Sequence, residues 1–247
     1  MADVIVPAIQ QAIKLLASGN PEVYATVYRS IYVAGVGTLL SCTWSIPIAA
    51  VLGLHNFRGK WVIKGFFNAL IGIPTVALGL LLFLLLYRQG ELASFNLLYT
   101  LNGIALGQAI LVTPIIVSFT SNALSNADMQ LRDLARTLGA SNLRTNLTLI
   151  RESFWSIILS ITASFNRGFG ELGIATIVGG NFLGETRVLT TAIATEIDFG
   201  KFDVAMAYAL ILMAIVIALA LVISLVEHIR QGDSWNMMSF WRGIGGG

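Results

Sequence analysis

The sequence predicts an all-α membrane protein, because its composition and its hydropathy pattern lead to the same fold class. Of the 247 residues, 56% are hydrophobic and 11% are charged, whereas a soluble domain carries roughly 25% charged residues. Apolar runs of about 20 residues, the length that a helix needs to cross the hydrocarbon core, recur along the chain. We therefore expect one transmembrane domain that covers residues 1–247.

Five apolar segments are long enough to span a bilayer, and they are 25–54, 62–87, 97–120, 153–172 and 204–227. We expect Pro74 and Pro114 to mark kinks, since proline removes a helical hydrogen bond. The glycines of the first span are expected to allow close helix packing. Residues 1–20 combine apolar and polar positions at helical spacing. They predict an amphipathic helix at the interface or against other helices.

Basic residues are shared unequally between the two sides of this topology. Nine lie around the connection after the first span, in the long connection 121–152 and in the tail, against five on the opposite side. Cytoplasmic loops carry the excess of Lys and Arg. We therefore expect the N-terminus outside and the C-terminus, with the tail 231–247, in the cytoplasm. Five spans also require the two ends to lie on opposite sides.

The connection 121–152 is too long for a simple turn and is predicted to hold two helices. An apolar stripe at i, i+3, i+4 and i+7 is formed by Leu131, Leu134, Ala135 and Leu138. Gly139 follows in the position favoured for a left-handed C-cap, and Ser141 or Asn142 caps the next helix. Periodicity alone fits a helix that lies on the headgroups as well as a helix that fits a groove of another protein.

Arg167 and Glu171 are opposite charges within the fourth predicted span. They are four residues apart, so they share a helix face and can pair. A charge in the bilayer costs about 2.5–3.5 kcal/mol, so such residues usually face a bundle interior or a water path. The pair therefore fits a pathway lining or outer gate, and equally an anchor of the helix end. Gln108, Thr113 and Asn166 can line a path or bond across helices.

Several functions are disfavoured by what the sequence lacks. There is no G-x-x-x-x-G-K-[ST] motif, so the chain is not expected to bind and hydrolyse ATP by itself. No chain of Asp, Glu and His runs through the spans, which argues against a proton-coupled carrier. The single cysteine, Cys42, excludes an internal disulfide and the cysteine-rich zinc sites. We expect no catalytic residue, no metal site and no cofactor in this chain, and the small net charge gives no indication of nucleic-acid binding.

The cytoplasmic segment resembles the EAA motif of ABC-importer permeases, E-A-A-x-x-x-G followed by I-x-L-P. Asp133 stands at the Glu position and Leu134 at the first Ala, while Ala135 and Gly139 match the motif. In place of I-x-L-P the chain has Leu149-Ile150-Arg151-Glu152. Because the proline is missing, the helix is free to run straight into the fourth span. The resemblance implies that this segment, including Leu131 and Leu138, contacts an ATPase.

Further stretches resemble permeases of the molybdate and tungstate oxyanion importers, the tungstate branch most closely. They are Ile73–Gly79, Gln108–Ile116, Asn166–Gly173, Val178–Asn181 and Thr190–Ala194. The similarity extends over about residues 20–230. It implies the type I ABC-importer permease fold. Our candidate residues for the translocation path or its gate, chosen from their position in the spans, are Pro74, Gln108, Thr113, Asn166, Arg167 and Glu171.

The resemblance also implies a function and its partners. The chain would be the membrane subunit of an ATP-driven oxyanion importer in a prokaryotic cytoplasmic membrane, for tungstate first and otherwise for molybdate, sulfate or phosphate. The partners would be a second copy of the chain, two ATPase subunits that hydrolyse ATP, and an extracytoplasmic binding protein. A stand-alone secondary transporter or channel, and a membrane scaffold without transport, are the competing hypotheses.

Overall fold

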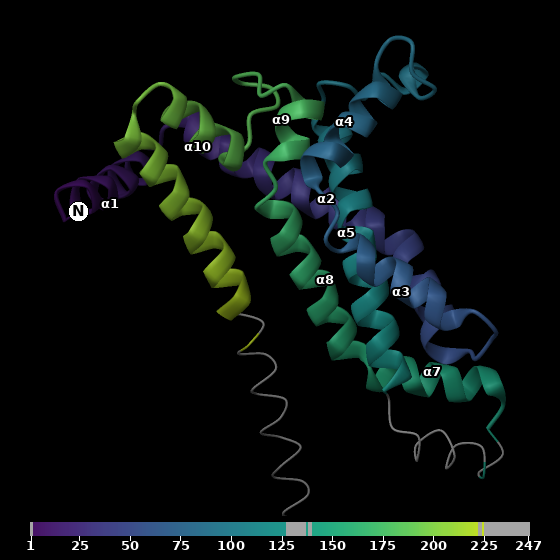
Figure 1. Cartoon of the computed structure of the whole chain (residues 1–247). Helices are drawn as coiled ribbons and strands as arrows, with labels where there is room; N and C mark the ends of the chain where they lie inside the picture. The colour runs from purple at the N-terminus through teal and green to yellow at the C-terminus, as the bar shows by residue number, and fades with distance from the viewer. Residues whose placement is uncertain (1, 127–136, 138–139, 222–223, 225–247) are drawn as a thin grey trace, which may run out of the picture. The chain divides into compact units, whose positions relative to one another are not determined.

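The computed structural model describes residues 2–126, 137, 140–221 and 224, and most of these residues are helical. Residues 1–212 form one compact unit and residues 213–247 a second. The contacts described below lie in the first unit, whose helices are labelled in Figure 1. Its helices are α1 Ala2–Ala17, α2 Pro21–Leu54, α3 Lys60–Leu70, α4 Thr75–Leu86, α5 Leu101–Ser125, α7 Asn142–Glu152, α8 Phe154–Phe169, α9 Gly173–Gly179 and α10 Leu189–Asp198, with a short 3-10 turn at Ala93–Phe95. A further helix, Phe202–Leu221, follows α10.

The first predicted span is one continuous helix, α2, that starts at a capped end. The Asn20 side chain accepts hydrogen bonds from the backbone N–H groups of Glu22 and Val23 at 3.0 and 3.4 Å, which satisfies two donors that a helix start leaves free. The expected packing role of glycine is confirmed at Gly37 and Gly53, where an added Cβ would lie 2.8 Å from the Ala105 oxygen and 2.5 Å from Leu124 Cβ, respectively. It is wrong for Gly35, where an added Cβ meets no atom of the described residues within 4 Å.

The second predicted span is broken, as expected, at Pro74. Helix α3 ends at Leu70, Pro74 precedes the first residue of α4, and the two helices meet at 96°. Lys64 anchors α3 on the end of α5, because its ammonium group donates to Asn122 Oδ1 at 3.1 Å and to Ser125 Oγ at 3.0 Å. The chain around Pro74 thus starts α4 in a new direction.

Helix α5 is the central element of this unit and contacts α2, α3, α4, α8 and α9. Ile104, Val112 and Ile116 are completely buried on it. The helix continues through Pro114 without a break. Its buried residues occupy all sides of the helix, so α5 provides the surface on which the other helices are positioned.

The connection 121–152 reaches the fourth predicted span through α7. Ser141 caps α7, as predicted, by accepting a hydrogen bond from the Arg144 N–H at 3.4 Å. The helix does not run straight into the span: α7 ends at Glu152, α8 begins at Phe154, and the chain changes direction at Ser153 between them (Figure 1). A change of direction therefore forms here without the proline of the family motif.

Three helices of the described residues are long and apolar enough to cross a membrane: α2, α5 and Phe202–Leu221. The bent pair α3 and α4 brings the number to four if it is counted as one span. The fourth predicted span, 153–172, is not one helix, because α8 stops after 16 residues at Phe169 and α9 begins at Gly173. The tail 231–247 lies outside the described residues.

Candidate translocation site

Glu171 is a buried carboxylate at the junction of α8 and α9, with 2% of its surface exposed. One of its oxygens accepts a hydrogen bond from Arg167 Nη1 at 2.9 Å. The other oxygen accepts from the backbone N–H groups of Gly173 at 2.8 Å and Ile174 at 3.3 Å. Both oxygens are therefore bonded, which makes the burial of the carboxylate tolerable.

The ion pair that the sequence predicts does form, but not on one face of a continuous helix. Arg167 lies in the last turn of α8, whereas Glu171 lies beyond the C-cap residue Gly170 and serves the first turn of α9. A cation at a helix C-terminus and an anion at a helix N-terminus are each favourable. The pair therefore joins the ends of two helices.

Helix α4 packs on the same junction. An added Cβ on Gly173 would lie 3.0 Å from Thr75 Oγ1 and 3.2 Å from Val76 Cγ2. Gly79, one turn further along α4, lies 3.4 Å by the same measure from the Gly173 oxygen. The break at Pro74 is what allows the first turn of α4 to reach the first turn of α9.

Helix α10 contributes the fourth contact. The Thr190 hydroxyl donates to the Glu171 backbone oxygen at 2.9 Å, and Thr190 is itself buried. Three of the stretches that resemble oxyanion permeases, Ile73–Gly79, Asn166–Gly173 and Thr190–Ala194, therefore meet at the junction of α8 and α9. The sequence gives no sign of this meeting, because the three stretches are far apart along the chain.

Gln108 occupies a different place, between two glycines of the helices that flank α5. An added Cβ on Gly37 of α2 would lie 3.1 Å from Gln108 Cβ, and one on Gly168 of α8 would lie 3.3 Å from Gln108 Oε1. The residue is 4% exposed, and Oε1 has no hydrogen-bond partner among the described residues. Small residues on both sides thus leave room for a long polar side chain, at the expense of an unpaired buried oxygen.

Thr113 and Asn166 differ in their hydrogen bonding. Thr113 bonds across helices, since its hydroxyl accepts from Trp44 Nε1 at 2.8 Å and lies 3.0 Å from Ser41 Oγ, both on α2. Asn166 Oδ1 is buried without a partner among the described residues. Among the described residues, neither the Asn166 oxygen nor the Gln108 oxygen accepts a hydrogen bond, so the two side chains are not joined through these atoms.

The predicted ATPase-coupling residues lie outside the described residues, and these are Leu131, Asp133, Leu134, Ala135, Leu138 and Gly139. The neighbouring helix α7 is described, and it exposes Leu143 and Leu147 four residues apart. Sequence reasoning overlooked this second apolar pair, although its i, i+4 spacing was visible.

Sequence reasoning also overlooked Arg29, which counts in the sequence only as one basic residue of the outer side. It is 6% exposed, pairs with Glu22 at 3.1 Å and donates to the Arg187 oxygen at 2.9 Å. The next residue, Ser30, accepts a hydrogen bond from the Leu189 N–H at 2.8 Å. The start of α2 thereby holds the start of α10, and with it Thr190.

The broken second span, the α8–α9 junction and the apolar helices define a helical transport subunit of the membrane. The chain belongs to the family of binding-protein-dependent transport system inner membrane components, whose family model matches residues 45–230. This confirms the resemblance to ABC-importer permeases that the sequence motifs indicate.

Individual relatives match nearly the whole chain. The tungstate uptake system permease protein TupB of Peptoclostridium acidaminophilum is 33% identical over 225 residues, which are 91% of this chain and 99% of that protein. The TupB protein of Campylobacter jejuni is 32% identical over 217 residues, 88% of this chain and 91% of its own. An inward-facing structure of the MetNI methionine ABC transporter matches 83% of this chain and 94% of its own with a TM-score of 0.66 and 14% identity. That likeness confirms the permease fold.

Proposed function

We propose that the chain is the membrane subunit of an ATP-driven importer that passes an oxyanion, tungstate in the first place, into the cytoplasm. The similarity to two tungstate uptake permeases over almost their full lengths supports this substrate. Molybdate, sulfate and phosphate are the alternatives within the same family. The transported anion is presented by a binding protein, so the permease itself needs only a weak site.

The proposed assembly contains two copies of the chain, two ATPase subunits and an extracytoplasmic binding protein. The missing ATP-binding motif in the sequence supports a separate ATPase. In the proposed orientation the N-terminus lies outside and the C-terminus inside the prokaryotic cytoplasmic membrane, which the distribution of basic residues supports. The segment Asp133–Gly139 would then fit a groove of the ATPase.

The observation that carries the mechanism is the meeting of α4 and α10 with the junction of α8 and α9. Helix α8 begins next to the cytoplasmic connection at Phe154 and ends at Phe169, about 24 Å away at 1.5 Å per residue. A displacement of α7 by the ATPase pair moves α8 as a rigid rod. The ion pair and the α9 cap transmit that displacement to α9 and α4, and the path alternates between its two openings.

Arg167 is the proposed contact for the anion in this path. Its side chain is 38% exposed. Among the described residues, its guanidinium group makes one hydrogen bond, from Nη1 to Glu171 Oε2. The Glu171 charge is also satisfied by two backbone N–H groups of α9. The remaining guanidinium edge can therefore bind an oxyanion through two parallel hydrogen bonds, weakly enough to release it.

Transport of labelled tungstate into proteoliposomes tests this function. The full complex should accumulate tungstate inside the vesicles only when ATP is present on the same side of the membrane as the ATPase subunits, with the binding protein on the other side. A complex with an ATPase variant that binds but does not hydrolyse ATP is the control and should remain inactive. Uptake by the permease alone, driven by an ion gradient, would contradict the proposal. Preferred uptake of molybdate or sulfate would change the proposed substrate but leave the proposed mechanism in place.

A further inference from the structure

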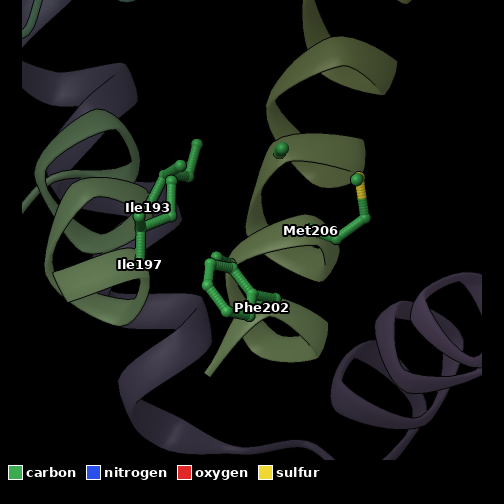
Figure 2. A pocket seen from close by; sticks show the side chains of 6 residues that line it. Ile193, Ile197, Phe202 and Met206 are labelled. Atoms are coloured by element: carbon green, nitrogen blue, oxygen red, sulfur yellow. The ribbon is translucent and has the colours of Figure 1, made fainter. Parts of the chain in front are cut away.

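An apolar cavity of about 320 Å³ lies between α10 and helix Phe202–Leu221. It is lined by Ile193, Ile197, Phe202, Ala205, Met206 and Ala209. Figure 2 shows Ile193 and Ile197 on one helix and the Phe202 ring of the other helix directed toward Ile197. Its volume falls in the range of roughly 300–1,000 Å³ that is typical of ligand sites. Because apolar cavities do not hold water stably, an apolar guest is the expected occupant.

The position of the cavity indicates where that guest comes from. Helix Phe202–Leu221 is long and apolar enough to cross the membrane, and most of its apolar stretch is not buried. A cavity along such a helix is open to hydrocarbon rather than to water. The turn at Phe199–Lys201 closes one end of the helix pair, and Phe199 and Phe202 are both exposed there. A lysine near the end of a membrane helix directs its ammonium group to the membrane interface, and Lys201 lies in this turn.

The charges beside this turn select among lipid headgroups. Lys201 is the one basic residue between 188 and 221, its side chain is 61% exposed, and its ammonium group lies 3.9 Å from Glu196 Oε2. Asp198 and Asp203 flank the same turn and are exposed. Three carboxylates and one ammonium group repel a net negative headgroup. They complement a headgroup that carries a phosphate for Lys201 and an ammonium group for the carboxylates.

We propose that this cavity is a specific site for phosphatidylethanolamine. One acyl chain lies between α10 and helix Phe202–Leu221, and the headgroup lies at the turn Phe199–Lys201. The lipid thereby supports α10, whose Thr190 bonds to Glu171. The proposal stands on the cavity and on the charges of the turn, and it does not depend on which anion is transported.

Lipid retention by the purified full complex tests the site. The complex is washed in detergent that contains equal amounts of phosphatidylethanolamine and phosphatidylglycerol with the same acyl chains, and bound lipids are counted by native mass spectrometry. Ala209→Phe and, independently, Ile197→Phe fill the cavity and should each reduce retained phosphatidylethanolamine by about tenfold. Leu84→Phe, on an exposed apolar position of α4, is the matched control and should retain as much as the wild type.

The headgroup assignment has its own variants. Lys201→Gln should lower the preference for phosphatidylethanolamine, and the double variant Asp198→Asn, Asp203→Asn should shift retention toward phosphatidylglycerol. Equal retention by the cavity variants and by Leu84→Phe would show unspecific lipid and overturn the proposal. It would also be overturned by a preference of the wild type for phosphatidylglycerol. Dissociation of the two permease copies in Ala209→Phe, without a change in bound lipid, would instead show that a second copy covers the cavity.

Discussion

Arg167 at the end of α8 and Glu171 before the start of α9 form an ion pair of 2.9 Å in which the carboxylate is almost completely buried. The same carboxylate caps α9 through two backbone N–H groups. The pair is thus a joint between two helices, and its two components, the charge and the cap, can be separated by mutation.

We expect Glu171→Ala to lower the free energy of unfolding by about 2–3 kcal/mol, because it removes the cap and a charge-assisted bond together. Glu171→Gln keeps an oxygen that can accept from Gly173 and Ile174, and its loss should be about half as large. Thermal unfolding of the detergent-solubilised protein, followed by tryptophan fluorescence, measures both. Equal losses in the two variants would show that the cap contributes nothing.

The contact between α4 and α9 depends on the absence of a side chain at Gly173. Gly173→Ala places a Cβ 3.0 Å from Thr75 Oγ1, and we expect a loss of about 1–3 kcal/mol from overpacking. Thr75→Ala in the same chain removes the clashing hydroxyl and should restore part of the stability. Gly35→Ala is the control, since nothing lies within 4 Å of its added Cβ. It should be neutral or slightly stabilising, because alanine favours helix. Strictly additive effects of the two substitutions would contradict the contact.

The protein should be more stable with an apolar residue of similar length in place of Gln108. Gln108→Met removes the unpaired buried oxygen and should raise the free energy of unfolding by about 1–2 kcal/mol. Thr113→Val, in the same helix, is the contrasting variant and should be destabilising, because Trp44 Nε1 loses its acceptor. If Gln108→Met unfolds at a lower temperature than the wild type, the carboxamide has a stabilising partner and the interpretation of an unpaired group is wrong.

The coupling role proposed for Gly139 is tested by uncoupling. Gly139→Val should leave the purified complex assembled and its ATPase active, but reduce tungstate uptake per ATP by about tenfold or more, since a β-branched residue resists a left-handed C-cap. Gly65→Val in α3 is the control, because its added Cβ meets no atom within 4 Å. Normal uptake per ATP in Gly139→Val would count against a docking role of this segment.

The sequence predicts the elements of this fold better than their contacts. Hydropathy, Pro74 and Ser141 predict local features that depend on nearby residues, and the structure confirms the break and the cap. The end of α8 at Phe169 was not predicted, because the apolar run continues past it while Glu171 turns away to cap α9. The meeting of Thr75 with Gly173 depends on chain segments about a hundred residues apart, for which a single sequence provides no signal.

The buried Arg29 illustrates the same limit in electrostatics. In the sequence it is one of five basic residues on the predicted outer side, and its spacing from Glu22 is compatible with a pair two turns apart. Its second partner, the Arg187 oxygen, becomes evident only in the fold. Gln108 is the opposite case: its polarity was visible, but the glycines on two other helices that make room for it were not.

The central claim is that the Arg167–Glu171 pair lies in the translocation path and that Arg167 contacts the anion there. Its most direct test is to measure tungstate uptake and ATP hydrolysis together in the reconstituted Arg167→Ala complex. We predict that ATP hydrolysis stimulated by the binding protein persists, while uptake falls by about tenfold or more, since the guanidinium edge that binds the oxyanion is lost. Tungstate uptake by the Arg167→Lys complex should fall between that of the wild type and that of Arg167→Ala, because an ammonium group cannot bind in the same bidentate way. Unchanged uptake in Arg167→Ala would contradict the account.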